Sequence, residues 1–190
     1  MPDGVGQPEG DGTPEERFTY SAEIRAAVVS ELTRRATEDK RLTGEAARLN
    51  VAHRRQLVAE CRRENGRALR GIVEVHGWPS RRHFGDEATT AALMIVLHAD
   101  DLQLQLQCRD LIAEAANSGD LADKLQLAYV VDLCAVAQGE AQSYGTRIDP
   151  QSGQPFPISD EGGVDERRRA VGLRSLAEQM AQIRAQQQGR

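Results

Sequence analysis

The sequence predicts an all-α protein: a compact bundle of about six helices with a small hairpin or extended flap near residues 142–158. Only 4% of the 190 residues are aromatic. The core must therefore be built from Ala, Leu, Val and Ile, a composition that favours packed helices over a β-sandwich. Apolar residues also recur at helical spacing along most of the chain. Together these observations predict a single helical domain at residues 15–187, preceded by a disordered acidic, Gly- and Pro-rich tail at 1–14.

The first two predicted helices form the N-terminal part of the bundle. The first should run from residue 14 to about residue 39, where the segment KRLTG breaks it. Its apolar face consists of Ile24, Val28 and Leu32. The second, at about residues 45–75, carries the longest apolar stripe, and several arginines occupy its outer face. Such a row of arginines can bind phosphate, but a solvated helix face is the commoner case.

The middle of the chain is predicted to hold one loop and three helices. The segment 76–85 (HGWPSRRHFG) should be a loop, because its glycine and proline do not permit a continuing helix. Helices are then expected at 86–98, from the HADD turn at 98–101 to residue 117, and at 121–138. Asp100 or Asp101 can cap the second of these helices, and Asp120 can cap the third.

The C-terminal part of the chain changes character. Within residues 142–158 the segments YGTRI and PFPI flank the turn-forming DPQSGQ, a pattern that predicts the hairpin or extended flap. The last helix should begin near residue 164 and continue through Leu173, Leu176, Met180 and Ile183. Short links between all these helices imply a compact bundle.

Composition argues against several classes of protein. A net charge of −5 opposes attraction of the whole protein to nucleic acid or to an anionic membrane. The N-terminus lacks the basic and apolar regions of a signal peptide. No run approaches the ~18 consecutive apolar residues that a membrane-spanning helix needs. We therefore expect a soluble, cytoplasmic protein.

The three cysteines, Cys61, Cys108 and Cys134, lie far apart and inside predicted helices. Their number is odd, and the sequence contains no CxxC pair. This pattern predicts buried, reduced thiols in the cytosol, not disulfides or a zinc site.

The sequence lacks the common motifs of nucleotide-binding and serine-hydrolase folds. It has no GxGxxG after a predicted strand, no GxxxxGK[ST] and no GxSxG. His76, His98 and Asp132 could supply a two-histidine, one-carboxylate metal set, but no HExxH, HxH or ExxH spacing supports one. The sequence therefore predicts no metal site and leaves any cofactor unknown.

Three polar residues fall on apolar helix faces, where an unpaired polar group costs roughly 1–3 kcal/mol. His98 faces inward at the end of its helix, and Asp132 lies on the packed side of the helix at 121–138. Asn65 replaces a hydrophobe in the stripe of the helix at 45–75. Each is either a satisfied structural group or part of a site. Because all three occur beside a His-Gly-Trp-Pro loop, the two interpretations have about equal weight.

A histidine near a carboxylate is a ready general base, since the unperturbed pKa of imidazole, about 6.5, is close to working pH. Asp132 could orient either His76 or His98. Tyr144 would donate a hydrogen bond, and Trp78 would either form a pocket wall or anchor the loop in the core. The alternative is a His–Asp pair that only fixes helix packing.

Several segments together resemble a bacterial family of unknown function. They are HGWPSRRHFGDEATTAALMIVLHAD and AQSYGTRIDPQSGQPFPISDEGGVDERRRAVGL, which contain an HGWP segment, a helix ending in HAD, a YGT segment and a VDERR…VGL tail. The resemblance covers about residues 60–180. It implies a helical domain with one shared site formed by His76, Gly77, Trp78, Pro79, His98, Asp100, Gln142, Tyr144, Gly145 and Thr146.

Two positions depart from the pattern of that family. Arg147 stands where the family has Gln, and Leu133 stands where Arg is usual. If either position touches a ligand, the substrate is changed or the activity weakened. Arg147 adds a cation suited to a carboxylate or a phosphate.

These residues define the candidate site and two hypotheses for its function. Catalytic roles are predicted for His76, His98, Asp132 and Tyr144, and ligand binding for Trp78, Asn65, Asp100, Gln142, Thr146 and Arg147. One hypothesis is an enzyme that uses a His/Asp acid–base pair on a small molecule, in a hydrolase, lyase or transferase step. The other is a non-catalytic helical binding module, accessory or immunity-like, with a protein partner. A nucleic-acid binder that uses the helix at 45–75 is a third and weaker hypothesis.

Overall fold

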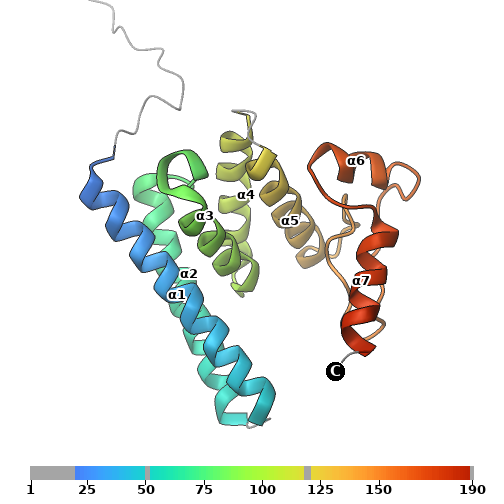
Figure 1. Ribbon diagram of the computed structural model, residues 1–190, viewed down its shortest axis with the longest axis horizontal. Coiled ribbons are helices and arrows are strands. Elements are labelled where there is room, and N and C mark those ends of the chain that lie inside the picture. Colours follow the sequence, from blue (N-terminus) through green and yellow to red (C-terminus); the bar gives the residue numbers. More distant parts are fainter. Residues whose placement is uncertain (1–19, 50–51, 118–120, 189–190) are drawn as a thin grey trace, which may run out of the picture.

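The computed structural model describes residues 20–49, 52–117 and 121–188, so the predicted tail at 1–14 and the predicted cap Asp120 lie outside it. The described ranges form seven α-helices (Figure 1): α1 (Ala22–Leu49), α2 (Ala52–His76), α3 (Arg81–His98), α4 (Leu102–Ala116), α5 (Leu121–Ala137), α6 (Val164–Ala170) and α7 (Leu176–Gln188). They contain no strand, which confirms the all-α prediction. Not one of these helices combines the length and the apolar composition that crossing a membrane requires.

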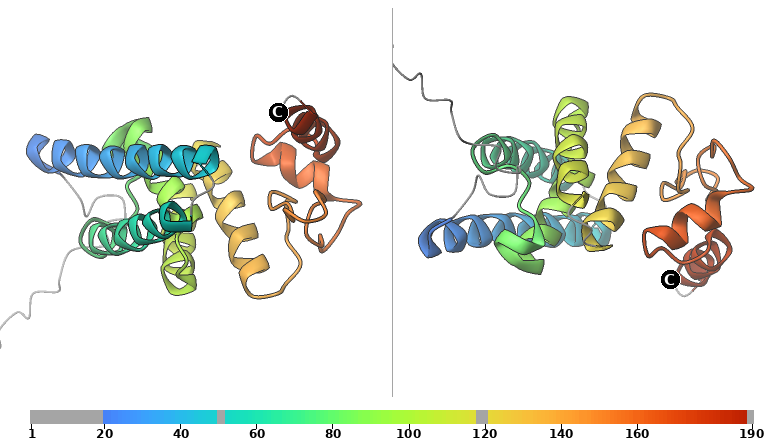
Figure 2. Two further views of the ribbon diagram at one scale, coloured as in Figure 1. Left: turned by 90° about the horizontal axis from the view of Figure 1, so that it is seen from below. Right: turned by 90° about the horizontal axis from the view of Figure 1, so that it is seen from above.

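Helices α1 to α5 share one apolar core. The pair α1 and α2 is antiparallel, α3 packs against both, and α5 packs against α3 and α4 (Figures 1 and 2). The fully buried centre includes Leu32, Leu69, Ala88, Ala92, Val96, Leu104, Cys108, Ile112, Ala128 and Val130. Aliphatic and small side chains thus fill the interior, as the low aromatic content predicted.

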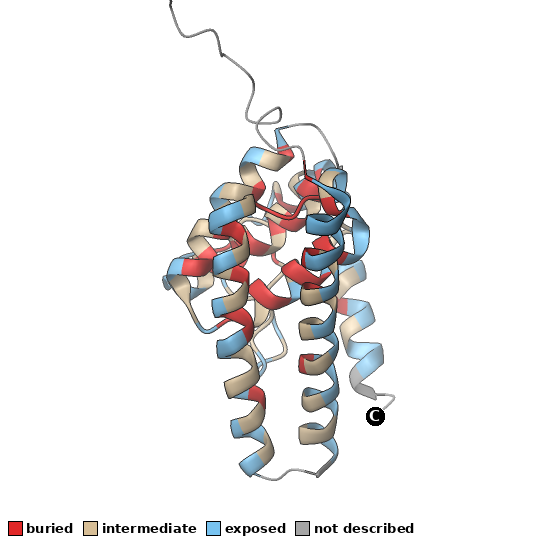
Figure 3. Ribbon diagram, turned by 90° about the vertical axis from the view of Figure 1, so that its left-hand side faces the viewer, coloured by how far each residue is buried: buried red, intermediate tan, exposed pale blue. Residues whose placement is uncertain are grey.

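The far ends of α1 and α2 extend past this core as a two-helix arm, residues 40–48 and 52–60 (Figure 3). Buried residues concentrate in the half of the pair that contacts α3. In the arm only Val58 is buried, and the other residues are exposed or half-buried. The arm therefore buries little apolar surface, and Arg54 of α2 forms an ion pair with Glu45 of α1 across it.

The predicted break of the first helix at 40–44 (KRLTG) does not occur, because these residues lie inside α1. Arg41 forms ion pairs with Glu38 and Glu45, which lie about one turn away on either side. Pairs at this spacing stabilise a helix. They offset part of the cost of Gly44, about 1 kcal/mol relative to alanine in a helix interior.

Two further boundaries differ from the prediction. The loop that was expected over ten residues is confined to 77–80, because α2 continues through His76 and α3 begins at Arg81. Gly85, with φ of 80°, interrupts α3 without ending it. The last predicted helix is two helices, α6 and α7, and Gly172 lies between them with φ of 79°. By contrast, Asp101 caps α4 as expected, since its carboxylate accepts from the Leu104 amide at 3.0 Å.

The loop between α2 and α3 is anchored in the core. Trp78 is only 5% exposed, and its indole Nε1 donates to the Gln126 side chain of α5 at 3.2 Å. The Thr89 hydroxyl lies within hydrogen-bond distance of the Pro79 and Gly85 carbonyls, at 2.8 and 2.7 Å. Of the two interpretations of Trp78, the structure shows the core anchor.

The C-terminal unit, residues 138–188, lies beside the five-helix body (Figures 1 and 2). Helices α6 and α7 pack on each other, and among the described residues neither packs on α1 to α5. The buried cluster of the body has no member after Cys134. The segment 142–158 folds back on itself through two isolated bridges, Gln142–Ile158 and Ile148–Pro155, which agrees with the predicted extended flap.

The three thiols should react very unequally in the folded protein. All are free, and burial raises the pKa of Cys108 to about 12 and also raises the pKa of Cys61 and of Cys134. Because the thiolate is the nucleophile, a thiol reagent at about pH 8 should leave Cys108 unmodified in the native protein. All three should react after unfolding in guanidinium chloride. Mass spectrometry of the labelled peptides checks this, and fast native labelling of Cys108 would contradict it.

Candidate functional site

The predicted site residues lie in three separate places. Asp132, Gln142, Tyr144, Thr146 and Arg147 gather where α5 meets the flap; Asn65, His76 and Trp78 belong to α2 and its following loop; His98 and Asp100 line a cavity. His98 and Arg62 of α2 both form hydrogen bonds with Asp39, so Arg62 marks the position of His98 along α2. His76 lies 14 residues after Arg62 on the same helix. At 1.5 Å per residue this is about 21 Å of helix. The two histidines therefore do not share a site.

Asp132 is fully buried and is satisfied by the chain that follows α5. Its Oδ1 accepts from the amides of Ser143 and Tyr144, at 2.8 and 3.0 Å. Its Oδ2 accepts from the amide and the hydroxyl of Thr146, at 2.8 and 2.9 Å. Four donors occupy both oxygens, so this carboxylate fixes the flap and is not the orienting partner of either histidine.

Gln142 continues this network with its side chain, which is also fully buried. Its Nε2 donates to the carbonyls of Arg147 and Phe156, at 3.0 and 2.9 Å, and its Oε1 accepts from the Arg147 amide at 2.9 Å. The two sides of the flap are thereby joined. Burial lowers the pKa of the Arg147 guanidinium, and the charge of Asp132 opposes that shift.

Arg168 of α6 completes the junction, and no sequence argument had identified it. Its side chain is fully buried and donates to the carbonyls of Tyr144 and Arg174, both at 2.6 Å, and to the Gln179 side chain. The backbone of Tyr144 thus lies between the carboxylate of Asp132 and the guanidinium of Arg168. The signal available in the sequence was the spacing of four from Val164, which places Arg168 on the inward face of a short helix.

The second group of predicted residues has structural contacts. Asn65 bridges α2 to α1, since its amide accepts from the Arg35 guanidinium at 3.2 Å and donates to the Arg35 carbonyl at 3.4 Å. The backbone carbonyl of His76 accepts from the Tyr20 hydroxyl at 2.6 Å, and its ring meets the Tyr20 ring edge-on. With Trp78 in the core, this group closes the bundle around the end of α2.

His98 has a carboxylate partner, and that partner is Asp39 of α1. The Nδ1 atom of the His98 ring is hydrogen-bonded to Oδ2 of Asp39. The other oxygen of Asp39 accepts from Nε of Arg62 at 2.9 Å and from the Thr43 hydroxyl at 3.3 Å. Nη2 of Arg62 in turn donates to Oγ1 of Thr43 at 3.2 Å. The pairing expected between His98 and Asp132 is thus made by a residue of another helix.

The charge of Asp39 is held by these contacts. The side chain of Asp39 is 6% exposed, that of Arg62 30% and that of His98 32%. Burial acts to raise the pKa of Asp39, but hydrogen bonds from His98 and Arg62 and their charges outweigh it, so the pKa lies below its ordinary value. Asp39 is therefore an ionised carboxylate surrounded by donors at neutral pH.

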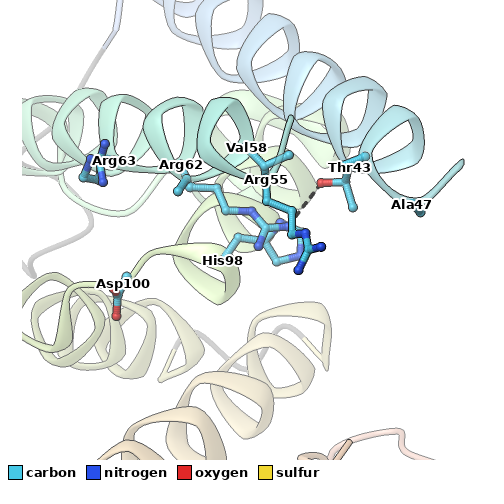
Figure 4. A pocket seen from close by; sticks show the side chains of 10 residues that line it. Thr43, Ala47, Arg55, Val58, Arg62, Arg63, His98 and Asp100 are labelled. Atoms are coloured by element: carbon cyan, nitrogen blue, oxygen red, sulfur yellow. Dashed lines mark hydrogen bonds between the residues drawn. The ribbon is translucent and has the colours of Figure 1, made fainter. Parts of the chain in front are cut away.

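A cavity of about 720 Å³ opens beside this network, between the arm and the end of α3 (Figure 4). It is lined by Thr43, Ala46 and Ala47 from α1, Arg55, Val58, Ala59, Arg62 and Arg63 from α2, and His98 and Asp100 at the end of α3. Its volume lies in the range of small-molecule sites, about 300–1,000 Å³. Charged and apolar residues in one lining, together with a hydrogen-bonded histidine, make it the best candidate site in the described part of the chain.

A second cavity, of about 650 Å³, lies between the flap and α7. Its lining is largely apolar, with Phe156, Ile158 and Met180 among its walls. None of the predicted site residues lines it, and it contains no histidine. Its lining offers the carboxylates of Glu161 and Asp165 but no imidazole for acid–base chemistry.

Asp39, Thr43, Arg55 and Arg62 were missed as site residues. Asp39 comes seven residues after Leu32, on the same face of α1, so the rule that identified His98 applied to it as well. It was overlooked because the first helix was expected to end there. No group of three or more His, Cys, Asp or Glu residues able to hold a metal ion occurs among the residues that the structure describes.

Fold and site together define a small helical protein with a polar cavity between a helical hairpin and a third helix. The chain belongs to a family of unknown function, DUF6624, whose model matches residues 40–188. The expected resemblance to an uncharacterised family is confirmed at that level. No curated protein and no solved structure matches the chain. The match includes the arginines of α2 and His98, and it begins one residue after Asp39.

Replacing Asp132 by Asn should destabilise the protein strongly. The amide retains one acceptor oxygen and turns an NH2 group towards donors, so buried donors lose their partner. We expect a loss of about 3 kcal/mol in the free energy of unfolding, measured by urea denaturation. Asp110→Asn is the matched control, because that side chain is 66% exposed and pairs with its sequence neighbour Arg109. Equal stability of the two variants would contradict the structural role of Asp132.

Asp39 should make stability depend on pH in acid. Its pKa is lower in the folded protein than in the unfolded chain, where it is about 3.9. The ionised carboxylate therefore stabilises the fold above about pH 4, and this contribution disappears as the pH falls through the folded-state pKa. The difference in unfolding free energy between the wild type and Asp39→Asn should shrink on acidification. A constant difference down to the lowest pH at which both fold would contradict this assignment.

Proposed function

We propose that the cavity between the arm and the end of α3 is the active site of an enzyme that acts on a small molecule. In this proposal His98 is the general acid–base, and Asp39 orients it. The observation that carries the proposal is the hydrogen bond between the His98 ring and Asp39 in the wall of the cavity. About a third of the His98 side chain is exposed while Asp39 is shielded, so a substrate can reach the base but not the residue behind it.

The bond to Asp39 decides which ring nitrogen can act. An ionised carboxylate only accepts hydrogen bonds, so the ring proton resides on Nδ1. Nε2 then carries the lone pair, and no hydrogen bond within the described residues occupies it. Such an imidazole can remove a proton from a hydroxyl, a water or an acidic carbon and return it to a leaving group. The charge of Asp39 stabilises the imidazolium formed in between.

The donors around Asp39 hold this geometry before any substrate arrives. Arg62 belongs to α2, Thr43 to α1 and His98 to α3, so the carboxylate is fixed by three helices. A positioned base needs no reorganisation during the reaction, which lowers the barrier to proton transfer. The arrangement suits a hydrolase, lyase or transferase step, each of which moves a proton at the reacting centre.

A second candidate function is a non-catalytic binding or accessory module that uses the same cavity. The contact between Arg62 and Asp39 favours it, because the guanidinium shares the carboxylate charge that would stabilise an imidazolium. A cavity of this kind can recognise a ligand without changing it. The two candidates differ in turnover, which the same experiment can measure.

A thermal-shift screen of a metabolite library against the wild type, His98→Gln and His53→Gln tests the proposal. His53 is an exposed histidine of α2 and serves as the matched control. We expect some compounds to raise the melting temperature of the wild type and of His53→Gln but not of His98→Gln. The reason is that His98 lines the cavity and His53 does not.

Each stabilising compound is then incubated with the three proteins, and its conversion is followed by mass spectrometry. Conversion by the wild type that falls by at least about 100-fold in His98→Gln is expected for an enzyme that uses this base. Stabilisation that depends on His98 without conversion would favour the binding module. Compounds that stabilise all three proteins equally would remove the cavity from consideration.

A further inference from the structure

We propose that the molecule bound in this cavity carries a terminal oxyanion, a phosphate or a carboxylate, which sits between Arg62, Arg55 and His98. The inference rests on the proposed function, because it names the substrate class of the same cavity. It is drawn from the donors that the wall presents, the charge around them and the apolar floor beside them.

Arg62 is a fixed donor with one nitrogen left over. Its Nε is bonded to Asp39 and its Nη2 to Thr43, so the plane of the guanidinium is set by two partners. No hydrogen bond within the described residues uses Nη1 of Arg62. A guanidinium that is already oriented loses little further freedom when its remaining N–H groups bind an oxyanion.

Arg55 adds a second cation on the same side of the cavity. Arg55, Arg62 and His98 all line the cavity, and Figure 4 shows the side chains of the two arginines extending from α2 on the side of His98. Their Cα atoms are seven residues apart, about 10.5 Å along the helix, a gap that two long side chains can close from opposite ends. Two guanidinium groups facing one space are donors suited to a single oxyanion, and Nε2 of His98 stays beside it as the acceptor of a proton.

The charge of the cavity also favours an anion. The carboxylate of Asp39 is occupied by Arg62 and His98 and is shielded behind them. The wall itself carries three arginines and a single aspartate, Asp100, and Asp39 behind the wall brings the number of carboxylates to two. This excess of positive charge is local, since the whole chain has a net charge of −5. A local excess attracts a small anion without making the whole protein a binder of nucleic acid.

The floor of the cavity indicates what the rest of the ligand resembles. Ala46, Ala47, Val58 and Ala59 form an apolar surface beside the charged groups. A ligand that carried only an oxyanion would leave this surface in contact with water. An organic phosphate or carboxylate with a short apolar body would cover it, at roughly 25 cal/mol for each Å² of apolar surface removed from water.

Arg63 provides a matched control on the same helix. It also lines the cavity, but Figure 4 places it farther along α2, on the side of Asp100 and away from the His98 ring. Arg55→Gln and Arg63→Gln remove the same charge from exposed positions about two turns apart on one helix. Any difference between them therefore reports on position and not on net charge.

Butyl phosphate, butyrate, inorganic phosphate and butanol are titrated against the full chain, and the His98 ring protons are followed by NMR after assignment with His98→Gln. We expect saturable shifts with butyl phosphate or butyrate, weaker binding of inorganic phosphate and none of butanol. Arg55→Gln should weaken binding about tenfold, as for one lost charge-assisted hydrogen bond, and Arg63→Gln by less than about twofold. Melting curves first establish that both variants are folded.

The outcomes separate this inference from the proposed function. Binding by only one of the two organic anions supports the inference and identifies the oxyanion. Equal weakening by Arg55→Gln and Arg63→Gln would mean diffuse charge and overturn it, as would displacement of butyl phosphate by a short DNA duplex. Butanol that shifts the His98 ring as strongly as butyl phosphate would also overturn it, yet leave His98 as an acid–base. The absence of any shift overturns the inference, and the metabolite screen then decides the proposed function separately.

Discussion

The buried carboxylate of Asp39 is the point at which three helices of the body are joined. It belongs to α1 and takes its donors from α2 and α3 as well as from its own helix. A carboxylate removed from water costs several kcal/mol unless donors replace its hydration, so the packing of these helices must deliver Arg62 and His98 to one place. The need of the Asp39 carboxylate for hydrogen-bond donors thus fixes the helix packing, and it also fixes the imidazole of His98 in the wall of the cavity. Architecture and candidate chemistry therefore depend on one contact.

Helical periodicity was a good guide where an apolar stripe was continuous, and it failed where other forces set the boundary. It predicted the helices that became α4 and α5 nearly to the residue. It did not predict that α1 passes through the segment 40–44, because ion pairs of Arg41 sustain the helix there. It also missed the break at Gly172, because Leu173 and Leu176 continue the apolar spacing across it. An apolar stripe indicates which face of a helix is buried. It does not indicate whether the helix is interrupted between two residues of the stripe.

The candidate site was predictable in its residue types but not in its pairings. His98 and Asp132 were identified because each interrupts an apolar face, and each does form part-buried hydrogen bonds. Their partners could not be read from the sequence, since periodicity gives the direction of a side chain and not what lies opposite. Asp132 meets amides 11 to 14 residues along the chain, whereas His98 meets a residue 59 positions away. Only the packing of α1 on α3 brings that second pair together.

The backbone of Tyr144 lies between the buried charges of Asp132 and Arg168, and this position affects how the chain unfolds. Its amide is bound by Asp132 of the body, and its carbonyl by Arg168 of the C-terminal unit. The buried cluster of the body ends at Cys134, so apolar cohesion does not extend across this junction as it does within the body. Opening of residues 138–188 would therefore break these hydrogen bonds without exposing the buried cluster of α1 to α5. Amide hydrogens of Ser143, Tyr144 and Thr146 would then exchange with solvent at a common rate, faster than those of the core helices.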